Sequence, residues 1–522
     1  MLKRWLEVAG LVVLYGVTHG WMLLNRGIYW DDWCHYHASP LVVKYEFWQS
    51  GLIWPGYLQS FLYSFQDGIL LHRLIIFGCY LGAMLALWGI LKREDRVSDF
   101  DRLGIVGLFM AFPVNQARIV LANIHFAIPY FLFFMAWLAL SFQVERPRWW
   151  LRVLAGVGFF LSFFMNSILV FFGCVLVWLF WIKRQSFKRY PDFILLPILF
   201  WIFRNTVIKP FGFWAGYNSL SVHSLALSPF RTVLGMCQSF FAPLDAGLDL
   251  ILSWSWVAVA AVVLVGWWRR EDADQRVSPW WGFGFGVVAL IAAIFPYAAV
   301  GSAAMPDVGQ WFSRHQTLVP LGAALILVYG VRGMFPSVTA QRWVIAGLLS
   351  VCMFATIGRY VELQKDWFKQ VALIEWFKSD PEIRAHHTFL IADRAVEFNA
   401  NERFLRPYEY GALFYEAFGD QTRFGMSTED HLWERGGVVS LFAQYRAEIP
   451  KARKWGVFTS LEIGKMKDYA PAPFDYQLTI TATHPYPLSF KKTMVLALKS
   501  WVNPPAFRQA TTHLITIKGA QF

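Results

Sequence analysis

The sequence predicts a mainly α-helical fold, a polytopic bundle of membrane helices followed by a small α/β portion, and composition is the first observation behind it. The 522 residues are 57% hydrophobic and only 16% are charged. Soluble domains are roughly a quarter charged, so this balance is typical of a membrane protein. Mean hydropathy is +0.40. Many of the 27 tryptophans lie near the ends of apolar runs, where amphipathic rings prefer the lipid headgroup level.

Apolar stretches that suit membrane crossings are the second observation. A crossing takes roughly 20 apolar residues, and about eleven candidates occur, some of them short. Asn166 and Ser167 alone interrupt the fifth and sixth, which therefore form either a tight helical hairpin or one long buried helix. The candidates are 6–24, 69–91, 103–121, 125–142, 152–166, 168–182, 191–207, 250–268, 280–300, 316–331 and 343–358.

The first candidate, which follows Lys3 and Arg4, is too long for the core of a signal peptide and has no small-residue cleavage site after it. We expect an uncleaved first transmembrane helix.

The distribution of basic residues is the third observation, and it predicts the orientation. Cytoplasmic loops of membrane proteins are enriched in lysine and arginine. With a cytoplasmic N-terminus, the alternate loops on the inside are the basic ones, which predicts eleven crossings and an outer C-terminus. The same rule accounts for most of the net charge of +12, so we expect no nucleic-acid partner. The inner basic residues are Lys92, Arg93, Arg96, Arg102, Arg146, Arg148, Arg152, Lys183, Arg184, Lys188, Arg189, Arg269, Arg270, Arg276, Arg332 and Arg342.

Residues 1–358 are predicted to form the transmembrane domain, with long outer loops at 25–68 and 208–249. The mixed polar and apolar stretch 41–65 predicts helices that lie along the membrane interface. Residues 359–522 carry ordinary charge and predict a soluble α/β domain on the outer face. Its expected elements are a helix at 361–379 and strands at 388–392, 476–483, 493–498 and 513–518.

Two adjacent acids, Asp31 and Asp32, are the strongest candidates for chemistry. They follow the first apolar segment directly and stand among four aromatic residues. A neighbouring carboxylate and an apolar frame both raise the pKa of a carboxyl, which suits a general base toward a hydroxyl. The same pair could also hold a divalent cation or simply cap a helix. His35 and His37 follow closely, although their spacing alone is weak evidence for a metal site.

A second candidate region, around Arg314, begins at the predicted helix end with Tyr297 and continues after a short outer loop with Arg314 and His315. A lone cation at the outer start of a membrane helix needs an anionic partner, and a guanidinium grips phosphate in bidentate fashion. We therefore expect Arg314 to contact a substrate phosphate. The alternative is an interfacial arginine that reaches lipid headgroups.

Other polar residues are predicted to converge on the same outer face. Arg118 falls near the outer end of the third expected helix, and Arg204 near the outer end of the seventh. Together with His72, Arg73 and Asn205 they could line a cavity for an anionic headgroup, although a single residue of this kind is more often structural. Further outer acids that could assist are Asp245, Asp249 and Asp307.

Several chemistries lack their motifs in this sequence. There is no Walker A loop, dinucleotide fingerprint, zincin motif or nucleophile elbow. The five cysteines show no paired spacing, so we expect neither a disulfide framework nor a metal cluster. A reaction here must therefore use a substrate that arrives already activated.

The pattern resembles the GT-C superfamily of integral membrane glycosyltransferases, which includes protein mannosyltransferases, lipid A aminoarabinose transferases and arabinofuranosyltransferases. The features that carry the resemblance are Asp31-Asp32 in a first outer loop, helices along the interface after it, a many-helix core and a C-terminal outer domain. The string Ser313-Arg314-His315 after a helix end at Pro296-Tyr297 adds to it.

The resemblance implies a bacterial inner-membrane enzyme that moves a sugar from a polyprenyl-phosphate donor to a glycan, lipid or protein of the cell envelope. Asp31 or Asp32 would activate the acceptor hydroxyl on the periplasmic side. Arg314 would stabilise the departing phosphate, with His315, Arg118, Tyr297, His35 and Arg204 as further substrate contacts. No cofactor is required, and a divalent cation such as Mg²⁺ or Mn²⁺ is optional. The alternatives are a transporter or flippase for a lipid-linked sugar, a polysaccharide polymerase or ligase, and a binding scaffold.

Overall fold

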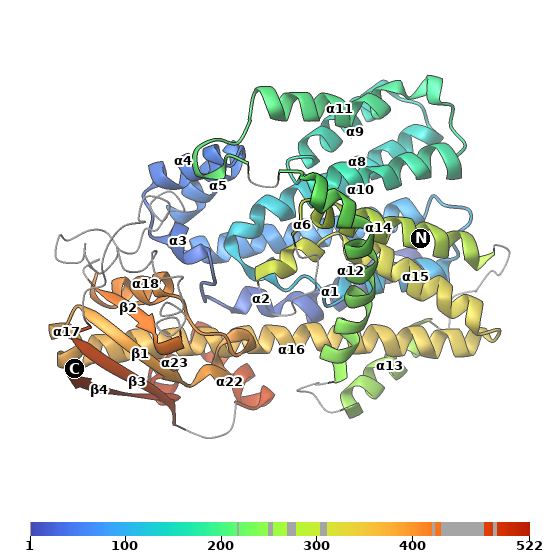
Figure 1. Cartoon of the computed structure of the whole chain (residues 1–522). Helices are drawn as coiled ribbons and strands as arrows, with labels where there is room; N and C mark the ends of the chain where they lie inside the picture. Colours follow the sequence, from blue (N-terminus) through green and yellow to red (C-terminus); the bar gives the residue numbers. More distant parts are fainter. Residues whose placement is uncertain are drawn as a thin grey trace.

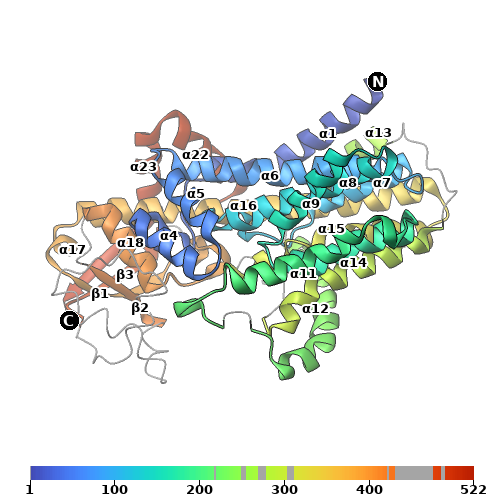
Figure 2. The same ribbon diagram turned by 90° about the horizontal axis from the view of Figure 1, so that it is seen from above.

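The computed structural model describes residues 2–216, 219–248, 254–268, 278–302, 311–419, 423–429, 474–483 and 488–521. Within them the chain is mainly helical, as the composition predicts, with a four-stranded sheet near the C-terminus (Figure 1). The N-terminus and the sheet lie at opposite ends of the molecule in both ribbon views (Figures 1 and 2). The loop after the first helix lies at the sheet end, because its residues Ile28 and Trp33 share a hydrophobic core with the sheet.

Four helical segments in the described part of the chain are long and apolar enough to cross a membrane: Gly68–Leu91, Leu121–Glu145, Pro279–Ala299 and Val338–Ser379. They include α6 (Gly68–Leu91), α8 (Ile124–Glu145), α14 (Pro279–Ala299) and α16 (Val338–Ser379). Shorter apolar helices stand at other expected crossings: α1 (Leu2–His19), α9 (Trp149–Ser162), α10 (Ser167–Val177), α13 (Trp254–Trp268) and α15 (Val319–Met334). The chain turns between α9 and α10, so the fifth and sixth candidates are two separate helices.

The third expected crossing, 103–121, is shorter in the structure. Helix α7 (Asp99–Ala111) ends two residues before Pro113. Proline disfavours helical geometry in the residue that precedes it, which explains an end at this point. The chain then forms two 3₁₀ turns, η1 (Ala117–Ile119) and η2 (Leu121–Asn123). A short polar segment thus replaces the last turns of the expected helix.

The expected interfacial stretch 41–65 is helical, as α4 (Pro40–Gln49) and α5 (Ile53–Tyr63). The second long loop also contains a helix, α12 (Val222–Leu248). The remaining elements of this part are α2 (Trp21–Leu24), α3 (Asp32–Tyr36), the π-helical turn η3 (Trp178–Ile182), η4 (Phe187–Arg189), α11 (Pro191–Thr206), η5 (Gly212–Trp214) and η6 (Trp311–Gln316).

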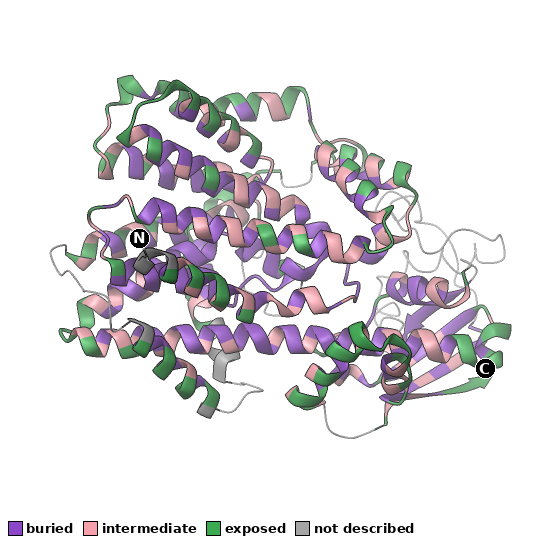
Figure 3. Ribbon diagram, turned by 180° about the vertical axis from the view of Figure 1, so that it is seen from behind, coloured by how far each residue is buried: buried purple, intermediate pink, exposed green. Residues whose placement is uncertain are grey.

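Helix α16 joins the two ends of the molecule. Its 42 residues span about 63 Å at 1.5 Å per residue. The expected helix 361–379 and the last expected crossing are one continuous element, so the expected domain boundary at 358/359 falls inside it. Figure 3 shows buried residues along most of its length.

The sheet has the strand order β2-β1-β3-β4. Strand β1 (Thr388–Arg394) pairs in parallel with β2 (Phe424–Ser427) and β3 (Tyr476–Ala482), and β4 (Ile515–Gln521) pairs antiparallel with β3. The predictions of β1, β3 and β4 are confirmed, whereas β2 was not expected. The helices of this region are α17 (Pro381–Ala385), η7 (Val396–Phe398), η8 (Ala400–Glu402), α18 (Pro407–Phe418), α22 (Phe490–Val502) and α23 (Pro504–Thr512).

The strand expected at 493–498 is wrong, because these residues lie in the middle of α22. The side chain of Ser489 caps this helix by accepting a hydrogen bond from the backbone N–H of Lys492. The buried positions Thr493, Leu496 and Ala497 are spaced by three and four residues, which is the helical period.

Two hydrophobic cores meet at the loop that carries Asp31 and Asp32. Tyr29 and Trp30 belong to the core of the helix bundle. Ile28 and Trp33 belong to the second core, which contains residues of α16, α18 and the sheet. Aromatic and aliphatic side chains on both sides of the acid pair therefore fix this loop between the two parts of the molecule.

Candidate active site

The carboxylate of Asp32 holds two segments of the chain together. Its Oδ2 accepts a hydrogen bond of 2.7 Å from the backbone N–H of Leu121, and its Oδ1 accepts one of 2.7 Å from Ala122. The side chain is 0% exposed. Burial raises the pKa of Asp32 to about 7, and these two hydrogen bonds are the largest effects that oppose the rise. Both oxygens are thus engaged with the turn η2.

Arg73 links the same two segments as a hydrogen-bond donor, whereas Asp32 is an acceptor. Its guanidinium donates hydrogen bonds to the carbonyl oxygens of Asn25, Gly27 and Ile119. The side chain is fully buried on α6. Sequence reasoning suggested that Arg73 could line an anion cavity, whereas its hydrogen bonds show that it links the first loop to the 117–123 segment.

Asp31 differs from its neighbour. It is partly exposed. Among the described residues no hydrogen bond or salt bridge engages its carboxylate, so its oxygens are available to a ligand. Burial raises the pKa of this carboxyl, and the guanidinium of Arg314 is the largest of the effects that lower it. The structure therefore brings Asp31 within electrostatic range of Arg314, although 283 residues separate them in the sequence.

The backbone is strained directly before Asp31. Trp30 has a φ of +48°, in the left-handed region that bulky side chains avoid. Arg403 lies over its ring, with 5.3 Å between the guanidinium carbon and the ring centroid. Glu409 in turn binds Arg403 through two hydrogen bonds of 2.6 and 2.8 Å. Such strain concentrates at functional sites, where surrounding contacts enforce it. Sequence reasoning missed Arg403 and Glu409, because only the fold places them beside the first loop.

Arg314 lies in η6, which packs against η1. Ser313 fixes this packing, since its hydroxyl accepts a hydrogen bond of 2.9 Å from the backbone N–H of Ala117. Arg314 itself is 9% exposed. His315 stacks on Tyr297 with 4.4 Å between ring centroids, which gives both residues a packing role in this structure.

The two histidines of the first loop contact glutamates. Nε2 of His35 lies 3.3 Å from Oε2 of Glu46, and Nε2 of His37 lies 3.1 Å from Oε1 of Glu416. Burial alone lowers the pKa of His35, but the negative charges of Glu46 and the two aspartates outweigh it, so the net shift is upward. In the part of the chain that the structure describes, no three His, Cys, Asp or Glu side chains cluster as metal ligands.

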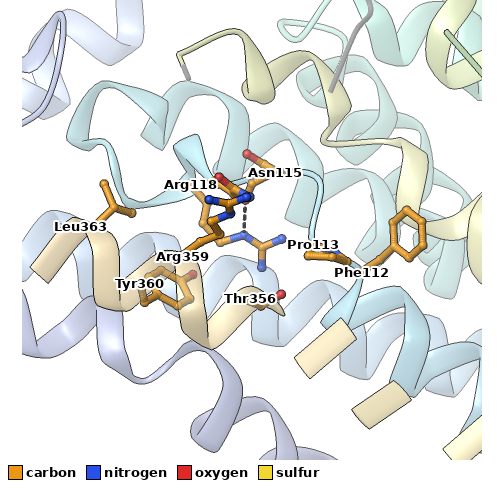
Figure 4. A pocket seen from close by; sticks show the side chains of 9 residues that line it. Phe112, Pro113, Asn115, Arg118, Thr356, Arg359, Tyr360 and Leu363 are labelled. Carbon is orange, nitrogen blue, oxygen red and sulfur yellow. Dashed lines mark hydrogen bonds between the residues drawn. The ribbon is translucent and has the colours of Figure 1, made fainter. Parts of the chain in front are cut away.

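Arg118 belongs to η1 and borders two small pockets. Its Nε donates to the carbonyl oxygen of Asn115, and its guanidinium carbon lies 4.8 Å from the ring centroid of Tyr80. Figure 4 shows the first pocket, between residues 112–118 and α16.

The remaining candidates are not brought to this site. Arg204 lies on α11, which packs against α9 and α10. Among the described residues no hydrogen bond or ion pair joins it to the first loop. Asp249 and Asp307, as well as the side chain of Asp245, fall outside the described part of the structure.

The site therefore combines a partly exposed carboxylate of raised pKa, Asp31, with a buried arginine, Arg314. The residues next to them, Asp32 and Ser313, both bind residues 117–123. This arrangement can accept a proton and stabilise a negative charge within the same space. Comparison of the chain with models of known families, with curated proteins and with solved structures gave no match.

Proposed function

We propose that this protein is a membrane glycosyltransferase that moves a sugar from a polyprenyl-phosphate carrier to an acceptor hydroxyl of the cell envelope. The observation that carries the proposal is the placement of Asp31 within electrostatic range of Arg314. The two charges supply the two functions that transfer from a phosphate needs, a base for the nucleophile and a cation for the leaving group.

Asp31 is the base in this proposal. It takes the proton of the acceptor hydroxyl as the acceptor oxygen bonds to the anomeric carbon. The bond from that carbon to the phosphate oxygen breaks, and its electron pair leaves with the phosphate, whose charge Arg314 stabilises. One carboxylate and no covalent intermediate give inversion at the anomeric carbon. The raised pKa of Asp31 suits proton transfer better than that of an ordinary aspartate.

Asp32 is a positioning residue in the same proposal. Both of its oxygens accept backbone hydrogen bonds and the side chain is fully buried, so it is less accessible to a substrate hydroxyl than Asp31. Its contact with Leu121 and Ala122 fixes the first loop against the segment that also binds Ser313. The sequence alone left the choice between the two acids open, and these contacts favour Asp31.

The proposed setting is a bacterial inner membrane crossed about eleven times, with the site and a C-terminal α/β domain on the periplasmic side. The placement of the N-terminus and the sheet at opposite ends of the molecule supports it. In this proposal the lipid carrier enters from the bilayer, and the reaction needs no cofactor, with a divalent cation optional.

The test is a transfer assay in proteoliposomes with a panel of radiolabelled polyprenyl-phosphate hexoses and pentoses and an extract of envelope acceptors. Loss of a general base lowers the rate by about 10²–10⁴-fold. We expect the transfer rate of Asp31→Asn to fall by a factor within this range. Asp95→Asn, a cytoplasmic-loop acid in the proposed topology, is the matched control. Full activity of Asp31→Asn would remove the base assignment, and carrier movement without a covalent product would favour a flippase.

A further inference from the structure

The pocket in Figure 4 has the composition of an anion site. Two arginines face it, Arg118 from η1 and Arg359 from α16, and no acidic side chain lines it. Arg359 also pairs with Glu362, at 2.8 and 2.9 Å, but Glu362 lies outside the lining. The wall of the pocket is therefore positively charged.

Arg118 lacks an anionic partner within the structure described. The side chain is only 6% exposed. Its guanidinium contacts the carbonyl oxygen of Asn115, the ring nitrogens of His19 at 3.2 and 3.3 Å, and the face of Tyr80. No carboxylate in the described ranges lies within salt-bridge distance. A buried cation without a counter-charge is costly, and a bound anion removes that cost.

Gln116 is a second and independent indication of a ligand. Its side chain is 8% exposed, yet neither its Nε2 nor its Oε1 has a hydrogen-bond partner among the described residues. Burial of an unpaired amide is unfavourable by about 1–3 kcal/mol. Gln116 lines the same pocket as the two arginines, so its N–H is placed to donate to an anion held there.

The rest of the wall tells which kind of anion fits. Phe112, Pro113, Tyr360 and Leu363 give the pocket an apolar lining. Its empty space is about 250 Å³, including solvent at the mouth. An apolar wall beside two guanidinium groups matches a phosphate ester on a lipid chain.

We propose that the pocket between residues 112–118 and α16 binds the phosphate ester of a lipid, with Arg118 and Arg359 as the cations and the Gln116 amide as a donor. This site is separate from the Asp31–Arg314 pair, because the lining includes neither of those residues. It does not depend on the transfer reaction, and a chain that lacks transferase activity could still possess it.

The test is equilibrium binding to the full chain in a neutral detergent, with three probes: a polyprenyl phosphate, the uncharged polyprenol, and inorganic phosphate. We expect the polyprenyl phosphate to bind at least about tenfold more tightly than the polyprenol, because hydrogen bonds to a charged group are worth about 1.5–3 kcal/mol. Gln116→Leu and Arg359→Gln should each weaken that binding about tenfold. Gln116→Leu removes an amide that has no bond to lose, so its folded state should be at least as heat-stable as the wild type.

Arg508→Gln, an exposed arginine on α23, is the charge-matched control and should bind normally. Asp31 does not line this pocket, so Gln116→Leu and Arg359→Gln should weaken binding by the same factor in an Asp31→Asn background, which separates failure of this site from failure of the transferase proposal. If the two pocket variants weaken the binding of inorganic phosphate as much as that of the polyprenyl phosphate, the phosphate group alone is the ligand and the lipid part of the proposal is overturned. Equal affinity for the polyprenol, or binding that neither pocket variant weakens, would overturn the proposal.

Discussion

Substitution of the two neighbouring aspartates by asparagine should separate a structural carboxylate from a chemical one. Asp32→Asn leaves one oxygen to accept from the 121–122 backbone and places an amide NH₂ against the other backbone N–H. Hydrogen bonds to a charged group contribute about 1.5–3 kcal/mol, and an unpaired buried donor costs about 1–3 kcal/mol. Because these two contributions overlap, we expect Asp32→Asn to lower the free energy of unfolding by about 2–4 kcal/mol.

Asp31→Asn is the matched control, since it makes the same chemical change one residue earlier. No hydrogen bond or salt bridge to the Asp31 carboxylate exists among the described residues, so its loss should change the free energy of unfolding by less than about 1 kcal/mol. The transfer rate should show the opposite order at equal amounts of folded protein, with Asp31→Asn the more damaged variant.

The assay is denaturant unfolding in detergent at pH 8, followed by tryptophan fluorescence. The pKa of Asp32 is raised to about 7, so at pH 8 the folded protein carries the ionised carboxylate that both hydrogen bonds require. Equal midpoints for the two variants would refute the reasoning, because they would mean that the contacts with Leu121 and Ala122 add nothing to stability.

Three further predictions follow from contacts around the site. Arg73→Met should leave three buried carbonyl oxygens without their donor and sharply reduce the yield of monodisperse protein in size-exclusion chromatography, with Arg73→Lys intermediate; normal yields of both would contradict the bridging role. In the transfer assay, the acidic limb of the pH profile should lie above the ordinary aspartate pKa, because that of Asp31 is raised, and Arg314→Gln should move the limb higher, since Arg314 lowers that pKa; a downward shift would count against the pairing. His37 lowers the pKa of Glu416, so this carboxyl should stabilise the fold at neutral pH and lose that contribution as the pH falls below the ordinary glutamate range. Glu416→Gln, compared with wild type by thermal unfolding, should cost under about 1 kcal/mol at pH 7 and less in acid.

The sequence predicted much of the helical framework, because apolar runs such as 69–91 and 280–300 leave few other structures open. It missed the end of α7 at Ala111. Pro113 signals this end, but it stands within the apolar run 103–121, which favoured a longer helix. The strand expected at 493–498 failed for a related reason. A short apolar run fits the period of a strand or that of a helix, and the N-cap at Ser489 favours the helix.

The candidate site was predictable in its residues more than in their roles. Asp31, Asp32 and Arg314 stood out by type and by position. Which aspartate is engaged depends on partners about 90 residues away in the sequence, and local pattern contains no information about them. The same holds for Arg73, whose burial against three carbonyl groups appears only when the first loop folds back on α6.

The uninterrupted course of α16 has a consequence for anyone who wishes to exchange or re-engineer the C-terminal portion. One inserted residue in a helix turns everything beyond it by about 100° and advances it by about 1.5 Å. Because Trp367 and Phe368 of this helix pack with Ile28 and Trp33 beside the acid pair, a graft joined out of phase would present the wrong helical face to that loop. Insertions of about seven residues, close to two full turns, should be accepted better than single ones, because they return the helix to nearly the same face.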